Sequence, residues 1–231
     1  MSDDSGQHVL IIGAGPGLGA SCARRAAAAG ARVTIVARTP ATVDPLVAEL
    51  AAQSADIAGW CADAGMEATF RSALQRIVAE RGVPTRVIYN AVDPTPKGMA
   101  STIAPDDLMQ SLATNVGGAL ITVQEVLDPM REAGGGSIIL TGGVLASKPW
   151  AQMSALSIGK AAMRSLAQCL AQELGEDDAV HLATVTIGGV IAPGTAFDPA
   201  DIADQFWQIC DTRDAGRGGE IIYRGAERAH A

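Results

Sequence analysis

The sequence is poor in aromatic residues and in histidine, and its cysteines are unpaired. Only 3% of the 231 residues are aromatic, although 48% are hydrophobic, so the core must be mainly aliphatic. Cys22, Cys61, Cys169 and Cys210 lie far apart and form no CxxC pair. This spacing indicates neither a zinc site nor a disulfide framework, and it is typical of mostly buried thiols in a reducing cytosol. The three dispersed histidines likewise predict no metal site.

Long apolar runs and an excess of positive charge are missing too. No stretch reaches the ~18 apolar residues that a membrane crossing needs, and the opening MSDDSGQ is polar and acidic, unlike a signal peptide. A formal net charge of -8 opposes binding to nucleic acid along a broad surface. We therefore expect a cytoplasmic protein that binds neither membrane nor nucleic acid. A small anionic ligand in one site remains compatible with this charge.

Short β-rich runs alternate with helical patterns along the chain. Strands are predicted at 8–12, 31–37, 56–62, 85–92, 134–143, 180–187 and 220–225. Helices are predicted at 18–29, 42–53, 66–81, 105–130, 156–174 and 202–210. This alternation indicates a parallel sheet with helices on both faces and right-handed crossovers. We expect one domain over 8–225, with a disordered tail at 1–7 and another tail at 226–231.

Four glycines in seven residues follow the first predicted strand. In the sequence GAGPGLG, Gly13, Gly17 and Gly19 have a GxxxGxG spacing, and an overlapping GxGxxA spacing begins at Gly15. Glycine allows the backbone to turn sharply and approach a pyrophosphate, while the amides and dipole of the following helix attract its charge. The pattern favours dinucleotide binding; a purely structural loop is the alternative.

The end of the second predicted strand indicates which dinucleotide is preferred. An NAD-selective site would place an acid about 20 residues beyond the glycine loop, where this chain reads Ala37-Arg38-Thr39. The guanidinium of Arg38 can pair with the 2′-phosphate that an acid would repel. NADP(H) is therefore preferred over NAD(H). The alternative is that Arg38 is a solvated charge at the end of a strand.

At these motifs the chain resembles the short-chain dehydrogenase/reductase family, over nearly its whole length. GAGPGLG is similar to the family's glycine loop, and WCADA to the segment whose aspartate, here Asp63, meets the adenine. YNAV at 89–92 is similar to the family's NNAG, with Val92 in place of the last glycine, and LATNVGGAL supplies the family's relay asparagine as Asn115. The resemblance implies a Rossmann-type, doubly wound three-layer α/β sandwich with a seven-stranded parallel sheet. It also implies homodimers or homotetramers.

The resemblance breaks at the residues that carry the family's chemistry. Lys160 falls at the lysine of the family's YxxxK pair, which binds the cofactor ribose and lowers the pKa of the tyrosine. Leu156 stands where that tyrosine is expected, and Gly143 where the catalytic serine is expected. The chain is thus identified as an atypical member that lacks both hydroxyl groups.

Three hypotheses follow from this departure. In the first, the protein is an oxidoreductase with a non-standard acid site that acts on a small carbonyl, imine or enone. The proton then comes from Lys160, from Thr141 or Ser157 through water, or from the substrate. In the second, the protein binds the cofactor without turnover, as a sensor or a partner subunit. In the third, it is a non-redox cyclase or lyase that uses the same pocket.

The candidate residues fall into two sets. The candidate catalytic positions are Lys160, Asn115, Thr141 and Ser157. The candidate cofactor-binding positions are Gly13, Gly15, Pro16, Gly17, Leu18, Gly19, Ala37, Arg38, Thr39, Asp63, Ala64, Asn90, Ala91, Val92, Lys160 and Ile187.

Overall fold

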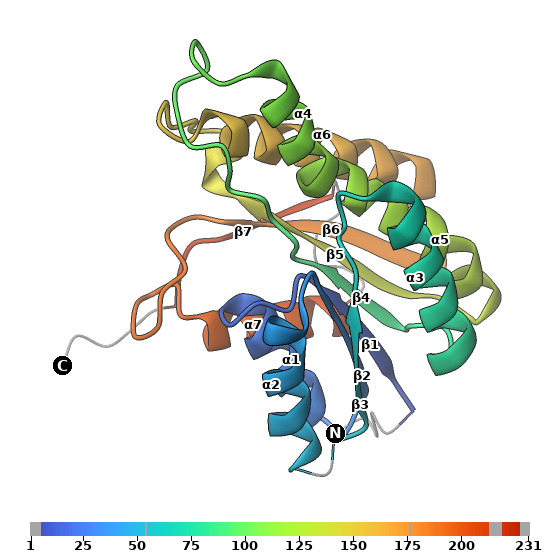
Figure 1. Ribbon diagram of the computed structural model, residues 1–231. Coiled ribbons are helices and arrows are strands. Elements are labelled where there is room, and N and C mark those ends of the chain that lie inside the picture. Colours follow the sequence, from blue (N-terminus) through green and yellow to red (C-terminus); the bar gives the residue numbers. More distant parts are fainter. Residues whose placement is uncertain (1–5, 54, 176, 213–218, 227–231) are drawn as a thin grey trace.

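Strands and helices alternate through the chain, as the sequence pattern predicts (Figure 1). The computed structural model describes residues 6–53, 55–175, 177–212 and 219–226, so the tails expected at 1–7 and 226–231 lie largely outside the described residues. The strands are β1 (His8–Ile12), β2 (Arg32–Ala37), β3 (Ile57–Cys61), β4 (Arg86–Tyr89), β5 (Gly136–Gly143), β6 (Val180–Ile187) and β7 (Glu220–Tyr223). The helices are α1 (Leu18–Ala28), α2 (Pro40–Ala51), α3 (Glu67–Arg81), α4 (Pro105–Leu112), α5 (Gly118–Glu132), α6 (Ser154–Leu174) and α7 (Pro199–Asp211).

The seven strands form one parallel sheet in the order β3-β2-β1-β4-β5-β6-β7. From β1 the chain winds outward to β3 and then returns to β4 on the other side of β1. This reversal makes the gap between β1 and β4 the topological switch point, where ligands of doubly wound sheets bind at the carboxyl ends of the strands. The predicted fold class is therefore confirmed.

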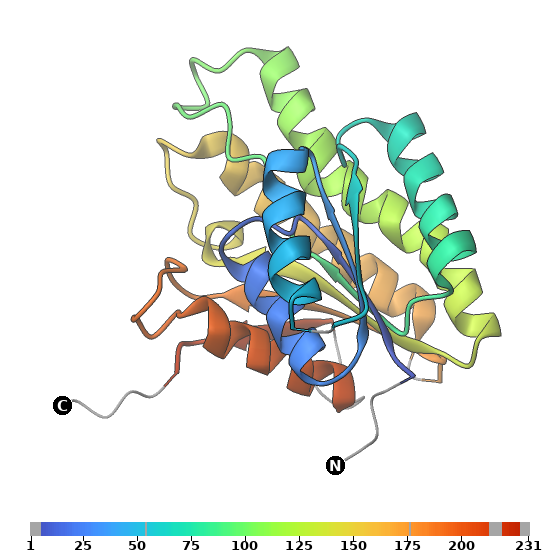
Figure 2. The same ribbon diagram turned by 60° about the horizontal axis from the view of Figure 1, so that its bottom comes forward.

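Helices cover both faces of the sheet, which explains why its central strands are apolar without alternation. One face packs against α1, α2 and α7, and the other against α3, α5 and α6 (Figures 1 and 2). All residues of β1 and β4 are buried. Within the described residues, no helix combines the length and the apolarity that a membrane crossing requires.

An indole ring between two guanidinium groups joins α1 and α7 to the sheet. The ring of Trp207 in α7 lies 3.8 Å from the guanidinium carbon of Arg86 in β4 and 4.5 Å from that of Arg25 in α1, measured to the ring centroid. Arg25 also bonds to Asp204, and Arg86 to Asp211, both in α7. These contacts position α7 beneath the sheet without adding charge to the carboxyl edge.

The single helix predicted over 105–130 is wrong in one respect. A π-helical turn, Ala113–Gly117, separates α4 from α5. After this turn the helix runs so close to β4 that a Cβ atom on Gly118 would lie 2.3 Å from the hydroxyl oxygen of Tyr89. The apolar periodicity could not show this interruption, because both halves keep a helical pattern.

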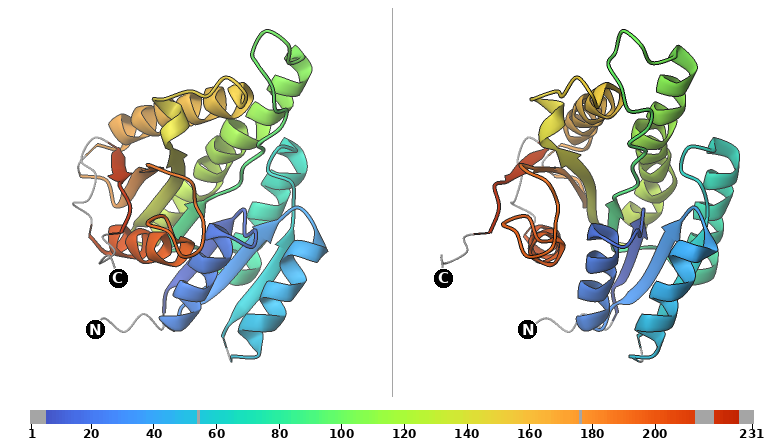
Figure 3. Two further views of the ribbon diagram at one scale, coloured as in Figure 1. Left: turned by 90° about the vertical axis from the view of Figure 1, so that its left-hand side faces the viewer. Right: turned by 60° about the vertical axis from the view of Figure 1, so that its left-hand side comes forward.

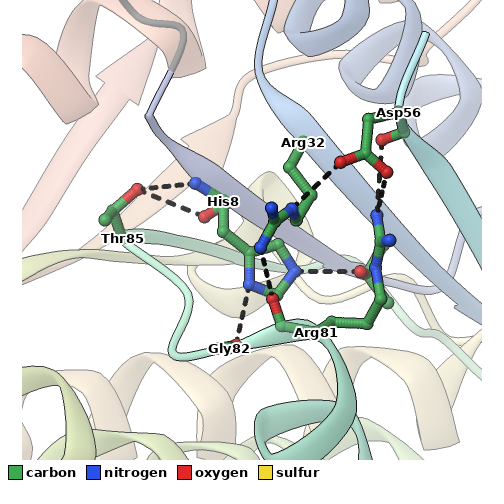
Figure 4. A network of polar contacts seen from close by, with 7 residues as sticks. His8, Arg32, Asp56, Arg81, Gly82 and Thr85 are labelled. Atoms are coloured by element: carbon green, nitrogen blue, oxygen red, sulfur yellow. Dashed lines mark hydrogen bonds and ion pairs between the residues drawn. The ribbon is translucent and has the colours of Figure 1, made fainter.

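At the amino edge of the sheet, charged groups are paired with one another (Figure 4). The carboxylate of Asp56 accepts hydrogen bonds from Arg32 and from Arg81, at 3.0 and 2.6 Å. Between them, the buried ring of His8 contacts the carbonyl oxygen of Gly82 at 2.9 Å and the hydroxyl of Thr34 at 2.8 Å. The charged and polar side chains at this edge therefore bond to one another and to the neighbouring backbone.

Candidate functional site

The glycine loop between β1 and α1 needs glycine at two positions for steric reasons. Gly13 has a φ of 88°, and a Cβ atom there would lie 2.3 Å from the amide nitrogen of Ala91. A Cβ atom on Gly19 would lie 2.3 Å from the carbonyl oxygen of Gly13. The amide of Asn90 donates to that same oxygen at 2.9 Å. The loop is thus packed tightly against the end of β4.

The other two glycines of the loop leave open space instead. A Cβ atom on Gly15 or Gly17 would meet nothing within 4 Å, and no side chain caps the first turn of α1. Pro16 lies exposed between these glycines, while Leu18 is buried and anchors the helix. Open backbone at an uncapped helix N-terminus is what a pyrophosphate requires, so these residues fit a dinucleotide.

Arg38 follows β2 directly and is exposed. Among the residues that the structure describes, its guanidinium has no hydrogen-bond or ion-pair partner, whereas most other arginines there bond a carboxylate. The neighbouring Thr39 hydroxyl lies 3.2 Å from the hydroxyl of Thr42. Arg38 is therefore available for an anionic ligand beside Ala37.

The remaining candidate cofactor residues lie at, or just after, the carboxyl ends of strands in the same sheet. The carboxylate of Asp63 accepts from the amide of Gly65 at 2.9 Å, which fixes the turn after β3, and Ala64 is buried behind it. Val92 is exposed after β4, and Ile187 is the buried last residue of β6. These positions converge on one edge because the strands are parallel.

Lys160 reaches this edge from α6. Its Nζ atom donates a hydrogen bond of 2.7 Å to the carbonyl oxygen of Thr141 in β5. Burial lowers the pKa of Lys160 to about 8, because a charged ammonium loses solvation there. No carboxylate of the described residues pairs with it. The chemistry available is that of an ammonium group able to release its proton near neutral pH.

Gly143 and Leu156, the positions at which the resemblance predicts missing hydroxyls, lie in β5 and in α6, the two elements that Lys160 connects. A Cβ atom on Gly143 would lie 3.7 Å from Cε of Lys160, an ordinary contact distance, so the backbone there has room for a Cβ atom. Leu156 is buried and contributes only apolar atoms. The Thr141 hydroxyl is also buried, and no described group forms a hydrogen bond with it. An unsatisfied buried hydroxyl is costly, which makes Thr141 a candidate for a ligand contact.

In the described part of the chain, no hydrogen bond joins Asn115 to Lys160. From the π turn its side chain bonds both backbone groups of Asp93: Oδ1 accepts from the amide at 2.8 Å and Nδ2 donates to the carbonyl at 2.9 Å. Nδ2 also lies 3.0 Å from Oγ of Ser111, and a Cβ atom on Gly159 would approach the Asn115 side chain to 3.1 Å. Asn115 thus fixes the loop after β4 against α6.

The hydroxyl of Ser157 is engaged at the start of α6. It donates to the carbonyl of Met153 at 2.9 Å and accepts from the amide of Trp150 at 3.1 Å. Through these two hydrogen bonds, the Ser157 hydroxyl fixes the loop that precedes α6. Among the four candidate catalytic residues, Lys160 and Thr141 are the pair that the structure brings together.

The sequence reasoning missed two exposed cations at the same edge, Lys97 after β4 and Lys148 after β5. One signal was present: the chain has only three lysines, and all three lie between β4 and the middle of α6.

Comparison with known proteins agrees with this geometry. Residues 7–201 match the short chain dehydrogenase family. The chain is 31% identical over 175 residues to 2,3-dihydro-2,3-dihydroxybenzoate dehydrogenase of Escherichia coli (strain K12), which covers 74% of this chain and 65% of that enzyme. About a third of that enzyme thus lies outside the match. An oxidoreductase of Sarocladium schorii is 31% identical over 176 residues, 75% of this chain and 68% of that protein.

Solved structures show the same fold. A metagenomic short-chain oxidoreductase in complex with NADP superimposes with a TM-score of 0.88 at 24% identity, covering 98% of this chain and 100% of that one. A variant of actinorhodin polyketide ketoreductase with NADPH gives a TM-score of 0.86 at 19% identity, covering 97% and 98%. The glycine loop, the position of Lys160 and the family match lead to one conclusion: the chain belongs to the short-chain dehydrogenase family of oxidoreductases.

Proposed function

We propose that this protein is an NADP(H)-dependent oxidoreductase that acts on a small organic carbonyl, imine or enone, with Lys160 as the proton donor in place of the family's tyrosine. The observation that carries the proposal is the ammonium of Lys160, held 2.7 Å from the Thr141 carbonyl oxygen at the same sheet edge as the open glycine loop.

The free guanidinium of Arg38 supports the preference for NADP(H). It directly follows β2, where an NAD-selective site would carry an acid, and among the described residues no carboxylate pairs with it. Amides at the start of α1 bind the pyrophosphate, and Asp63 and Asn90 complete the adenosine half of the site. When bound, the nicotinamide exchanges a hydride with the substrate.

Lys160 supplies the proton in the direction of reduction. A general acid works best when its pKa lies near the working pH, and the lowered pKa of about 8 brings the ammonium close to that condition. The apolar Leu156 keeps water away from the same region, which strengthens the interaction of the ammonium with developing negative charge. Gly143 leaves space beside the lysine for the substrate. An iminium ion or a conjugated acceptor needs less acid assistance than a ketone does, which suits a site without a phenol.

We also propose that the protein self-associates through α5 and α6, as a homodimer or homotetramer. Leu120 and Ile158 are exposed apolar residues on these two helices, and Ala161 and Cys169 extend the exposed face of α6. Small and apolar side chains allow close approach of helices from two subunits.

The oxidoreductase proposal is tested by the absorbance of the reduced nicotinamide, with NADPH and with NADH, against a panel of carbonyls, imines and enones. Oxidation is expected with NADPH first, and the rate should decrease as the pH rises through about 8, because Lys160 loses its proton there. If NADPH binds but its absorbance never changes with any compound, the redox function is abandoned in favour of cofactor binding without turnover.

One variant tests the role of Lys160, and a second tests the two positions without hydroxyls. The variant Lys160→Met should lower turnover by about a hundredfold or more, the usual contribution of a general acid. Turnover that survives alongside weaker NADPH binding would make Lys160 a ribose ligand only.

The double variant Gly143→Ser with Leu156→Tyr introduces the hydroxyls that the family carries at these positions, and it should raise ketone reduction about tenfold or more.

A further inference from the structure

Among the residues that the structure describes, the cations without a carboxylate partner lie at the carboxyl edge of the sheet. Most described arginines bond a carboxylate, and these ion pairs lie on the helices and at the amino edge. Within the described ranges, the cations that bond no carboxylate are Arg38, Lys97, Lys148, Lys160 and Arg224. Arg38 and Arg224 follow β2 and β7 directly, and the lysines follow β4 and β5 or lie in α6. In a chain of net charge -8, this edge is where an anion can bind.

Lys97 and Lys148 belong to two loops that are joined to each other. The amide of Gly98 donates to the carbonyl of Gln152 at 2.9 Å, and the hydroxyl of Ser154 donates to the carbonyl of Gly98 at 2.7 Å. Gly98 and Met153 form an isolated parallel bridge. Figure 3 shows the loop before α4 rising beside the start of α6. The two lysines are therefore carried by one connected unit.

Each of these loops repeats the same short pattern. Lys97-Gly98-Met99 and Lys148-Pro149-Trp150 both place a large apolar residue two positions after a lysine. Met99 is 53% exposed and Trp150 is 56% exposed, although side chains of these types are ordinarily buried. Each loop thus presents a positive charge together with apolar surface.

The nearby carboxylates do not neutralise these lysines. Asp93 accepts hydrogen bonds from the amide and the hydroxyl of Thr95, in its own loop. Asp106 and Asp107 lie in the first turn of α4, where the helix dipole stabilises their negative charge. None of these three acids forms an ion pair with a described lysine.

We propose that Lys97, Met99, Lys148 and Trp150 bind the substrate, and that this substrate is an apolar carbonyl compound with a carboxylate group. The apolar body lies on Met99 and Trp150, and the carboxylate pairs with the two ammonium groups. This inference rests on the proposed function, because the bound acid is a substrate only if the protein is an oxidoreductase. The binding itself requires no hydride transfer, so it is measurable even if turnover fails.

The test compares phenylpyruvate with its uncharged methyl ester, by isothermal titration calorimetry on protein saturated with NADP+. The acid should bind about tenfold more tightly than the ester at low salt, the effect of two exposed ion pairs, and the preference should shrink as salt is added. The double variant Lys97→Gln with Lys148→Gln should lose this preference and keep its affinity for NADP+. The variant Trp150→Ala should weaken both compounds equally.

Arg224→Gln is the matched control, because it removes an equally unpaired cation from the same sheet edge. It should leave the preference for the acid unchanged. An equal loss of preference in Arg224→Gln would mean that only net charge matters and would overturn the proposal. Equal binding of acid and ester by the unmodified protein, or no binding of the acid, would overturn it as well.

Discussion

Single side chains at the carboxyl edge differ in what burial does to them. Arg38 is exposed, and a planar guanidinium binds phosphate groups well, which makes it suited to selecting between two ligands that differ by one phosphate. Lys160 is half-buried, and its lowered pKa makes it suited to giving up a proton. In the proposed function the two cations therefore serve different steps, although neither has a carboxylate partner among the described residues.

At Arg38, replacement by aspartate should exchange the cofactor preference. The carboxylate of Arg38→Asp repels the 2′-phosphate and can accept from the ribose hydroxyls of NAD(H), so NADP+ affinity should fall about tenfold or more and NAD+ affinity should rise. Fluorescence titration with both dinucleotides measures the change. The same substitution at Arg224 should alter neither affinity; if it does, the effect is one of net charge.

His8 makes stability depend on pH at the opposite edge. Burial, with smaller contributions from the cationic Arg81 and Arg32, lowers the pKa of His8 from 6.5 to about 4. Between these values the unfolded chain takes up a proton that the folded protein does not. The free energy of unfolding should therefore be unaffected by His8 above pH 6.5 and should decrease by about 2 kcal/mol on going down to pH 5.

Urea unfolding of the protein and of His8→Gln at pH 7 and at pH 5 isolates this contribution. The variant loses stability at pH 7 because the contacts with Thr34 and Gly82 change, but its stability should vary less with pH. Parallel pH dependence in both proteins would assign the effect to the carboxylates instead.

At the scale of elements, the glycine loop and α1 act as one unit with two kinds of glycine. Gly13 and Gly19 allow the loop, α1 and the end of β4 to touch, while Gly15 and Gly17 leave backbone open. The π turn has a comparable role, because it places Asn115 where its side chain can fix the loop after β4. Close packing and ligand access are thus divided between neighbouring residues of the same segment.

Alanine at Gly19 and at Gly15 should therefore have different effects. Gly19→Ala pushes a methyl group against the Gly13 carbonyl and should lower the free energy of unfolding by about 1–3 kcal/mol and weaken dinucleotide binding. Gly15→Ala should leave the melting temperature almost unchanged and weaken dinucleotide binding alone. Thermal melts with and without NADP+ measure both quantities. Equal loss of stability in the two variants would contradict this division.

At the scale of the whole molecule, charge is distributed unevenly between the two edges of the sheet. Ion pairs close the amino edge and brace the helices, whereas unpaired cations remain at the carboxyl edge within the described part of the chain. The exposed faces of α5 and α6 lie outside this edge, so self-association through them would leave the site accessible.

A charge on that helical face should prevent self-association. Ala161→Glu buries a carboxylate if α6 packs against a second subunit, and light scattering should then report a mass close to the 23.6 kDa of one chain. Ala68→Glu makes the same change on the exposed face of α3 and should leave the larger mass intact. A single-chain mass for the unmodified protein would refute the proposed assembly.

Local sequence was sufficient for the order of strands and helices, the parallel sheet and the glycine loop, because these follow from apolar periodicity and from the steric freedom of glycine. The resemblance to the family's motifs, rather than periodicity, predicted the role of Lys160 and the absence of the family's hydroxyls at Leu156 and Gly143, and these remain predictions. The tertiary structure decided what depends on contacts between distant segments: the π turn at Asn115, the bond from Lys160 to Thr141, and the joining of the Lys97 and Lys148 loops. Burial and ion pairing depend on which segments pack against each other. The tertiary structure was therefore needed to show which of the described cations have a carboxylate partner and which do not.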